Sequence, residues 1–174
     1  MRVLLASSAS HVPPRGGSTR SNLAWLDMLA ANGHACRVVG GALSTDTPEK
    51  IAQIRRELED QEIDRAALEI LSIADPAERI AILKEQIQNF QPDWVLVSSE
   101  DIGQGLLHAA HESAPGRVIY LAHTPQFYPF GPESWNPDEE SAKLLSQSAA
   151  IVAIGHHSIP ANRPMPGPAS RLSP

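Results

Sequence analysis

The sequence predicts a Rossmann-like α/β domain of three layers, built around a mainly parallel sheet. Three observations favour this fold class: short apolar runs alternate with helical patterns, Gly- and Pro-rich loops follow those runs, and the chain has 174 residues. Strands buried on both faces of a parallel sheet read as continuous apolar runs. Because a domain with its own core typically has about 100–150 residues, the length accommodates one such domain.

The N-terminal part of the sequence reads as a βαβ unit. Its expected segments are a strand at residues 3–6, a loop rich in Ser, Pro and Gly at 7–18, a helix at 19–32 and a strand at 35–39. Ser18 or Thr19 can cap the start of the helix, and Gly33 stands where a left-handed residue ends one. Such units almost always cross over right-handed, which brings the two strands into one parallel sheet.

The middle of the sequence is more helical and more charged. A helix beginning at Thr47 and Pro48 carries an apolar stripe at its buried face, and charged residues occupy its remaining positions. The stripe consists of Ile51, Ile54 and Leu58. We interpret the charged positions as a solvated helix face.

Two segments between residues 67 and 90 follow. The apolar pattern of residues 67–73 fits a strand but is ambiguous. The next segment has a stronger signal, because Asp75 can cap a helix, Pro76 suits its first position and Glu78 its third. Apolar residues at helical spacing extend this predicted helix to about Phe90.

The C-terminal half continues the alternation. We expect strands at residues 94–97, 117–122 and 150–154, helices at 103–113 and 139–147, and loops at 98–102 and 123–138. The last loop holds four of the chain's eight aromatic residues. Five prolines among residues 160–174 prevent regular structure there, so we expect one domain over residues 1–159 and a disordered, proline-rich tail over 160–174.

Composition excludes several classes of function. The formal net charge of −6 argues against nucleic acid or an anionic membrane as the main partner. A single cysteine, Cys36, excludes an internal disulfide framework and a four-thiolate zinc site. No apolar run approaches the roughly 20 residues that span a bilayer, so we expect a cytoplasmic protein without a transmembrane segment.

The loops that leave the carboxyl ends of the strands are the expected place for a ligand. In the first loop, Arg15, Gly16 and Gly17 directly precede a helix, where backbone N–H groups favour an anion such as phosphate. A plain strand-to-helix turn explains the same glycines. Gly103 and Gly105 open another helix, but the third position of a dinucleotide-binding pattern is His108, so we interpret this segment as a helix start only.

Polar side chains follow two further strands. His123 comes directly after a strand, where a histidine can hydrogen-bond a substrate hydroxyl or act as a base; a buried histidine bonded to a loop is the alternative. Ser99, Glu100 and Asp101 follow the neighbouring strand and could hold sugar hydroxyls or a metal, or form a solvated acidic loop.

Two other patterns carry less information. His108 and His111 lie three positions apart on a helix, with Glu112 nearby, but no third strong metal ligand is placed beside them, so we expect no metal site. No Gly-x-Ser-x-Gly pattern exists that would support a hydrolase.

Four segments, in this order, resemble the N-terminal domain of retaining GT-B glycosyltransferases of family 4. The first segment is a strand at residues 1–5, followed by the loop Pro13-Pro14-Arg15-Gly16-Gly17 and a helix that ends in Gly33-His34. The second is the strand entry Gln91-Pro92-Asp93. The third is the strand of residues 118–123, which ends in histidine, and the fourth is the strand of residues 149–154, which Gly155 follows. The resemblance covers residues 1–159.

The resemblance implies a domain that binds the sugar acceptor and faces a second domain holding a nucleotide-sugar. It implies that Gly16 and Gly17 approach the phosphate and sugar of the donor and that His123, the expected catalytic residue, contacts the transferred sugar. Together with these glycines, the expected substrate-binding residues are Arg15, Ser99, Glu100, Asp101 and Thr124. No cofactor is expected, since the nucleotide-sugar is the donor substrate.

The sequence departs from the family in one respect. The second domain of the family carries a Glu-x7-Glu motif, and nothing after Ile159 can supply that domain; Glu49 and Glu57 have the same spacing but belong to the wrong domain. We therefore expect the chain alone to be inactive. The alternatives are a non-catalytic sugar- or nucleotide-binding or regulatory module, and a subunit of a split transferase that pairs with a separate C-terminal donor domain.

Two further expectations follow. An oxidoreductase that uses nicotinamide is disfavoured, because the Gly-x-Gly-x-x-Gly pattern is absent. The domain face meant for a second domain would be exposed, so self-association into a homo-oligomer is expected there.

Overall fold

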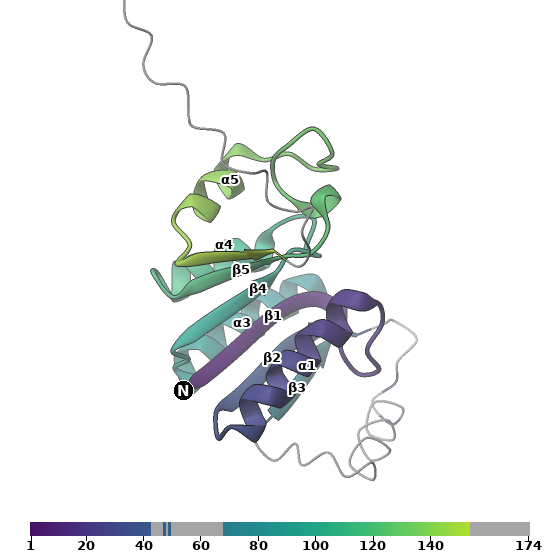
Figure 1. Ribbon diagram of the computed structural model, residues 1–174, viewed down its shortest axis with the longest axis vertical. Helices are drawn as coiled ribbons and strands as arrows, with labels where there is room; N and C mark the ends of the chain where they lie inside the picture. Colours follow the sequence, from purple (N-terminus) through teal and green to yellow (C-terminus); the bar gives the residue numbers. More distant parts are fainter. Residues whose placement is uncertain (43–46, 48, 50–67, 154–174) are drawn as a thin grey trace, which may run out of the picture.

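The apolar runs form one parallel sheet of six strands (Figure 1). The strands are β1 (Arg2–Ser10), β2 (Ala35–Gly41), β3 (Leu68–Ile73), β4 (Trp94–Ser98), β5 (Val118–Ala122) and β6 (Ala150–Ala153). Their order in space is β3-β2-β1-β4-β5-β6. The computed structural model describes residues 1–42, 47, 49 and 68–153. Residues 67–73, whose apolar pattern was ambiguous, contain strand β3, which pairs with β2 along its length.

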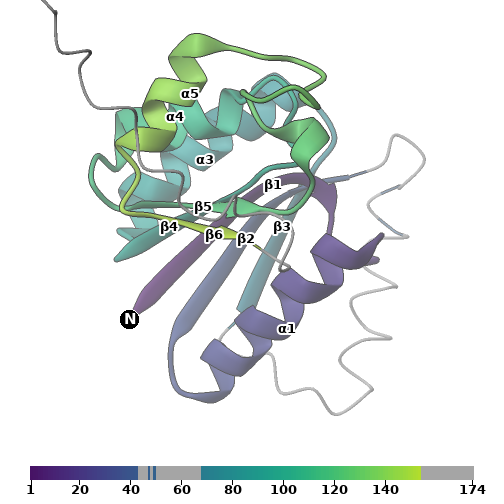
Figure 2. The ribbon, with the colours of Figure 1, turned by 45° about the horizontal axis from the view of Figure 1, so that its top comes forward.

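Helices cover both faces of this sheet. They are α1 (Gly17–Ala31), α3 (Pro76–Phe90), α4 (Gly105–Ser113) and α5 (Glu139–Ser146), with a short 3-10 helix η1 (Pro125–Phe127). Figure 2 shows α1 on one face and α3, α4 and α5 on the other, so the domain has three layers. This arrangement confirms the predicted Rossmann-like α/β fold.

The connections after β1 and β4 diverge to opposite faces. Helix α1 follows β1, α4 follows β4, and these two strands are neighbours in the sheet. Such a reversal leaves a crevice at the carboxyl ends of the strands, where ligands bind in open α/β sheets. The topology therefore places a candidate site at the ends of β1 and β4.

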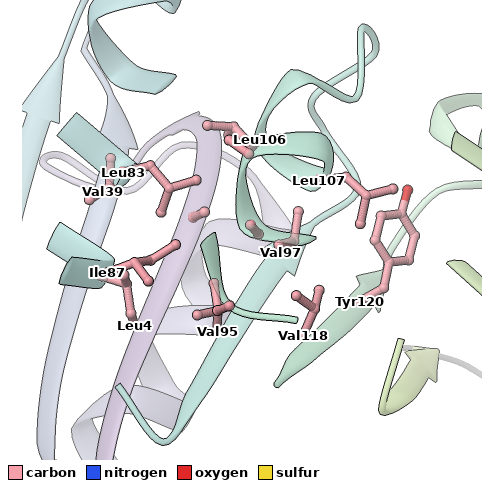
Figure 3. Close-up of a cluster of buried hydrophobic side chains, with 14 of the residues drawn as sticks. Leu4, Val39, Leu83, Ile87, Val95, Val97, Leu106, Leu107, Val118 and Tyr120 are labelled. Carbon is pink, nitrogen blue, oxygen red and sulfur yellow. The ribbon is translucent and has the colours of Figure 1, made fainter. Parts of the chain in front are cut away.

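A separate apolar cluster fills each side of the sheet, because successive side chains of a strand point to opposite faces. Leu4, Leu83 and Leu107 belong to one cluster on the side of α3 and α4 (Figure 3). The next residue, Leu5, packs with Leu26 of α1 on the other side. All five side chains are almost completely buried, so the strands are held from both faces.

The start of α3 confirms the prediction made from its sequence. The Asp75 carboxylate accepts a hydrogen bond from the backbone N–H of Glu78 at 2.8 Å, and Pro76 occupies the first turn. The left-handed C-cap Gln91 (φ 48°) ends the helix. Local sequence determines both boundaries of this helix.

The boundaries of other elements differ from the prediction by one to four residues, and three of these differences have an identifiable cause. Strand β1 continues to Ser10 instead of ending at Ala6, because its end pairs with Gly41 of β2 after a shift of register. Helix α1 begins at Gly17, since Thr19 does not cap it and instead donates its hydroxyl to the carbonyl of Arg15 at 2.8 Å. The helix expected from residue 103 begins at Gly105, because the preceding Gln104 is left-handed (φ 53°).

Several predictions fall outside the described residues. These are the helix with its stripe at Ile51, Ile54 and Leu58, the end of the last strand at residue 154, and the tail at 160–174. No helix in the described part of the chain is long and apolar enough to cross a bilayer.

Candidate functional site

Two glycines of β2 allow the end of β1 to bend closely over them. A Cβ added at Gly41 would lie 2.1 Å from the carbonyl oxygen of Ser8, and one added at Gly40 would lie 3.3 Å from Nδ1 of His11. The backbones approach this closely only because neither residue has a side chain. The His11 ring is held in place by a hydrogen bond between Nδ1 and the carbonyl of Ala9 at 3.1 Å.

His11 is completely buried at the end of β1. Its Nε2 has no hydrogen-bond partner among the described residues. Burial lowers the pKa of this imidazole, a nearby carboxylate of Glu100 opposes that shift, and His123 adds to it. At neutral pH the ring is therefore neutral, and its Nε2 is an acceptor without a partner in the described part of the chain.

The end of β4 carries a chain of polar contacts. Asn22 of α1 donates from Nδ2 to the hydroxyl of Ser98 at 3.4 Å, and this hydroxyl donates to Oε2 of Glu100. Asn22 and Ser98 are both buried. The second carboxylate oxygen, Oε1 of Glu100, is buried without a partner in the described part of the chain. One carboxylate oxygen is thus fixed by the protein, and the other has no partner among the described residues.

Strand β5 places His123 next to this carboxylate. The backbone N–H of His123 donates to the hydroxyl of Ser99 at 3.0 Å, and the N–H of Ser99 donates to the carbonyl of Leu121 at 3.0 Å. Burial lowers the pKa of the His123 imidazole, and the negative charge of Glu100 opposes that shift. Nε2 of His123 is also buried and without a partner within the described ranges.

Three buried polar atoms at the carboxyl edge of the sheet therefore have no hydrogen-bond partner among the described residues. They are Nε2 of His11, Oε1 of Glu100 and Nε2 of His123, from the ends of the adjacent strands β1, β4 and β5. Leaving one such atom unpaired costs roughly 1–3 kcal/mol. Since native structures rarely leave such atoms unsatisfied, this cluster is suited to polar groups of a ligand or to ordered water.

The loop between β1 and α1 adds an anion-binding element to this edge. Arg15, Gly16 and Gly17 are exposed, and a Cβ added at either glycine would meet nothing within 4 Å. No side chain in the described part of the chain caps α1, and its first turn contains no acidic residue. Free N–H groups at a helix start attract a negative group, so phosphate is the ligand that this loop suits best.

The remaining predicted substrate-binding residues have structural contacts. Oδ2 of Asp101 accepts a hydrogen bond from the N–H of Leu106 at 2.8 Å, which satisfies the start of α4. The carbonyl of Thr124 accepts from the N–H of Phe127 at 3.0 Å, which closes the turn of η1. Asp101 thus stabilises a helix end, while Thr124 lies directly beside His123.

The two histidines of α4 are not brought to this edge cluster. Nε2 of His108 lies 2.8 Å from the hydroxyl of Ser141, and Nε2 of His111 lies 3.0 Å from that of Ser148. Both contacts join α4 to the segment around α5. Within the described residues, no group of three His, Cys, Asp or Glu side chains could hold a metal ion.

Two residues of the site were missed by the sequence reasoning. No role was predicted for His11, although a lone histidine before two prolines and a Gly-Gly pair at the end of the second strand were visible signals. Asn22 stands among the apolar positions of the first helix, and a polar residue there indicates a buried hydrogen bond.

The sheet order and the polar edge together define a Rossmann-like domain with a candidate ligand site at its topological switch point. Among solved structures, a crystal structure of MurG from Acinetobacter baumannii is similar to this chain, with a TM-score of 0.49 and 16% identity over 92% of the chain. The chain spans 43% of the length of that MurG chain. No protein-family model and no curated protein matches the sequence. The fold therefore rests on the topology of the chain itself.

Proposed function

We propose that this chain is the acceptor-side domain of a GT-B glycosyltransferase of the retaining family-4 type, which transfers a sugar from a nucleotide-sugar to an acceptor. The observation that carries the proposal is the trio of unpaired buried atoms on His11, Glu100 and His123. The ordered motifs of the sequence support it, since they include a glycine loop after the first strand and a histidine at the end of β5.

Two neutral histidines beside a carboxylate suit sugar hydroxyls better than an anion. Both histidines have a lowered pKa, so each is neutral at pH 7. His11 donates its Nδ1–H to the carbonyl of Ala9, so its Nε2 is an acceptor, while Nε2 of His123 can donate or accept. The Glu100 carboxylate offers an acceptor to a hydroxyl and repels a phosphate. A polyol, whose hydroxyls both donate and accept, matches all three atoms.

The phosphate of a nucleotide-sugar would bind beside this cluster instead. The exposed start of α1 at Gly16 and Gly17, with Arg15 next to it, attracts negative charge. In this proposal the phosphate contacts the helix start, the sugar contacts the histidines, and His123 is the residue closest to the chemistry. His11 is a second hydroxyl-binding residue.

In the proposed reaction a second domain supplies most of the contacts to the nucleotide-sugar. We therefore expect the 174-residue chain to bind nucleotide-sugars weakly, with a Kd on the order of 1 mM. A non-catalytic sugar-binding module would use the same edge. Recovery of transferase activity with a separate donor domain would favour the split enzyme over that module.

Isothermal titration with UDP-glucose, GDP-mannose and ADP-glucose tests the proposal. We expect at least one of them to bind and His123→Gln to weaken that binding roughly three- to tenfold, as loss of a hydrogen bond worth about 1 kcal/mol predicts. His34→Gln is the matched control, because His34 precedes β2 at the opposite end of the strands. Binding of NAD without binding of any nucleotide-sugar or free sugar would refute the proposal.

A further inference from the structure

The loop of residues 123–138, here called the aromatic loop, is fixed by its own hydrogen bonds. The contacts are Trp135 N–H to Gln126 O at 2.9 Å, Asp138 N–H to Pro129 O at 2.8 Å, Ser134 Oγ to Tyr128 O at 2.5 Å, Gln104 Nε2 to Phe127 O at 2.8 Å and Asn136 Nδ2 to Ile102 O at 3.2 Å. Two of these bonds reach the segment that connects β4 to α4. The side chains of the loop are therefore displayed by a defined backbone.

This loop holds aromatic rings in solvent. Trp135 is 67% exposed and packs edge-on against Phe127 with ring centroids 5.5 Å apart. Phe130 is 50% exposed and lies over the buried Tyr128 at 5.8 Å, and Ile102 beside the loop is 41% exposed. Covering apolar surface contributes roughly 25 cal/mol per Å². A fixed, exposed apolar patch rimmed by polar residues is typical of a binding surface.

The patch adjoins the candidate site. The aromatic loop begins at His123, whose Nε2 belongs to the unpaired trio. Phe127 follows one turn later, because its N–H bonds the carbonyl of Thr124 at 3.0 Å. In Figure 2 the loop (green, between β5 and α5) leaves the sheet at the end of β5. A ligand that contacts His123 could therefore extend onto the Phe127–Trp135 pair.

The charge around the patch decides between classes of ligand. Glu133 lies within the aromatic loop, Glu139 and Glu140 follow it at the start of α5, and all three are exposed. Residues 123–140 contain no Lys or Arg. Negative charge at this rim repels anionic lipid headgroups and anionic acceptors. An uncharged ligand that combines an apolar group with hydroxyls meets no such repulsion.

We infer that the aromatic loop binds the alkyl or aryl group of a neutral glycoside or alcohol, whose hydroxyl end lies toward His123. The apolar group packs on the pair of Phe127 and Trp135, and the hydroxyl end reaches the polar edge. The inference rests on the proposed function, because it names the acceptor class of that reaction. Binding itself needs neither the donor nor a second domain.

Calorimetric titration of the chain with n-octyl β-D-glucoside, below its critical micelle concentration, tests the inference. Methyl β-D-glucoside is the matched ligand without the apolar group, and we expect it to bind at least about tenfold more weakly. Trp135→Ala should weaken octyl glucoside binding about tenfold, the loss expected when an aromatic contact of about 1.4 kcal/mol is removed. Trp135→Phe, which keeps a ring, should retain most of the binding.

Trp25→Ala is the matched protein control, since Trp25 is 44% exposed but lies on α1, away from the aromatic loop. It should bind octyl glucoside like the unsubstituted chain. Equal binding by Trp135→Ala, or equal affinity for the two glucosides, would overturn the inference. So would Trp135-dependent co-sedimentation with phosphatidylcholine or phosphatidylglycerol vesicles in the absence of octyl glucoside binding, because a bilayer would then be the partner.

The outcomes separate this inference from the proposed function. Binding of octyl glucoside that depends on Trp135, without binding of any nucleotide-sugar, would support the apolar subsite and count against sugar transfer. Nucleotide-sugar binding that depends on His123, without binding of octyl glucoside, would support the proposed sugar transfer and overturn the apolar subsite.

Discussion

The Gly41→Ala substitution probes how closely β1 and β2 approach beside the candidate site. The added Cβ would lie 2.1 Å from the carbonyl oxygen of Ser8 and 2.9 Å from its carbonyl carbon. Ordinary contact begins at 3.4 Å, so the two backbones must separate by about 1.3 Å. Because the obstacle is backbone on both sides, no side-chain rotation can relieve it.

The expected cost follows from this geometry. Overpacking of this kind typically destabilises a protein by about 1–3 kcal/mol, and the lower flexibility of alanine in the unfolded chain offsets roughly 0.4–1 kcal/mol of it. We therefore expect a net loss of about 1–2 kcal/mol in the free energy of unfolding. The displacement also moves the end of β1, so His11 should lose its position and nucleotide-sugar binding should weaken as well.

Urea denaturation followed by far-UV circular dichroism measures the effect. Gly103→Ala is the matched control, because a Cβ there meets nothing within 4 Å and its φ is not in the left-handed region. Gly40→Ala should be intermediate, since its added Cβ would lie 3.3 Å from a side-chain atom, Nδ1 of His11. If Gly41→Ala unfolds at the same urea concentration as Gly103→Ala, the close approach of the two strands is refuted.

Two further predictions concern stability. The pKa of His11 is lowered in the folded chain from 6.5, so the unfolded chain binds more protons in the window below pH 6.5 and the free energy of unfolding should fall as pH decreases there. Urea unfolding at pH 5 to 8 should show a shallower decline for His11→Gln, and an unchanged decline would contradict the assignment. Asp75→Ala should cost about 1 kcal/mol, since it removes the 2.8 Å cap of α3, whereas Asp75→Asn should retain most of the stability. Equal thermal midpoints for these two variants would argue against the cap.

Local signals predicted those parts of the fold whose causes lie close together in the sequence. The α3 boundary is an example, because Asp75, Pro76 and Glu78 are consecutive determinants of one helix start. The start of α1 was predicted less well, since Ser18 and Thr19 are both suitable caps, and Gly16 with its left-handed φ of 94° decides where the helix begins. The path of the loop, and not the local sequence alone, determines which of several neighbouring residues becomes the N-cap.

Some residues of the candidate site were predicted from the sequence, and others were not. His123, Ser99 and Glu100 were expected at strand ends, and the structure places them together, because the ends of β4 and β5 are neighbours. Asp101 was also expected to bind substrate, which stays a prediction, and the structure adds that its Oδ2 accepts a hydrogen bond at the start of α4. His11 was missed, since its burial depends on the glycines of β2.

By itself, the sequence of this protein determined the alternation of strands and helices, the parallel sheet and the loops at its carboxyl edge. Apolar periodicity and capping residues act over a few positions, so they can be recognised without knowledge of the fold. Only the tertiary structure decided which loop atoms are buried and unpaired. Glu100 and His11 interact electrostatically because β1 and β4 are adjacent strands, although 89 positions separate the two residues in the sequence. Burial and electrostatic coupling between such distant residues arise from packing, which no local pattern encodes.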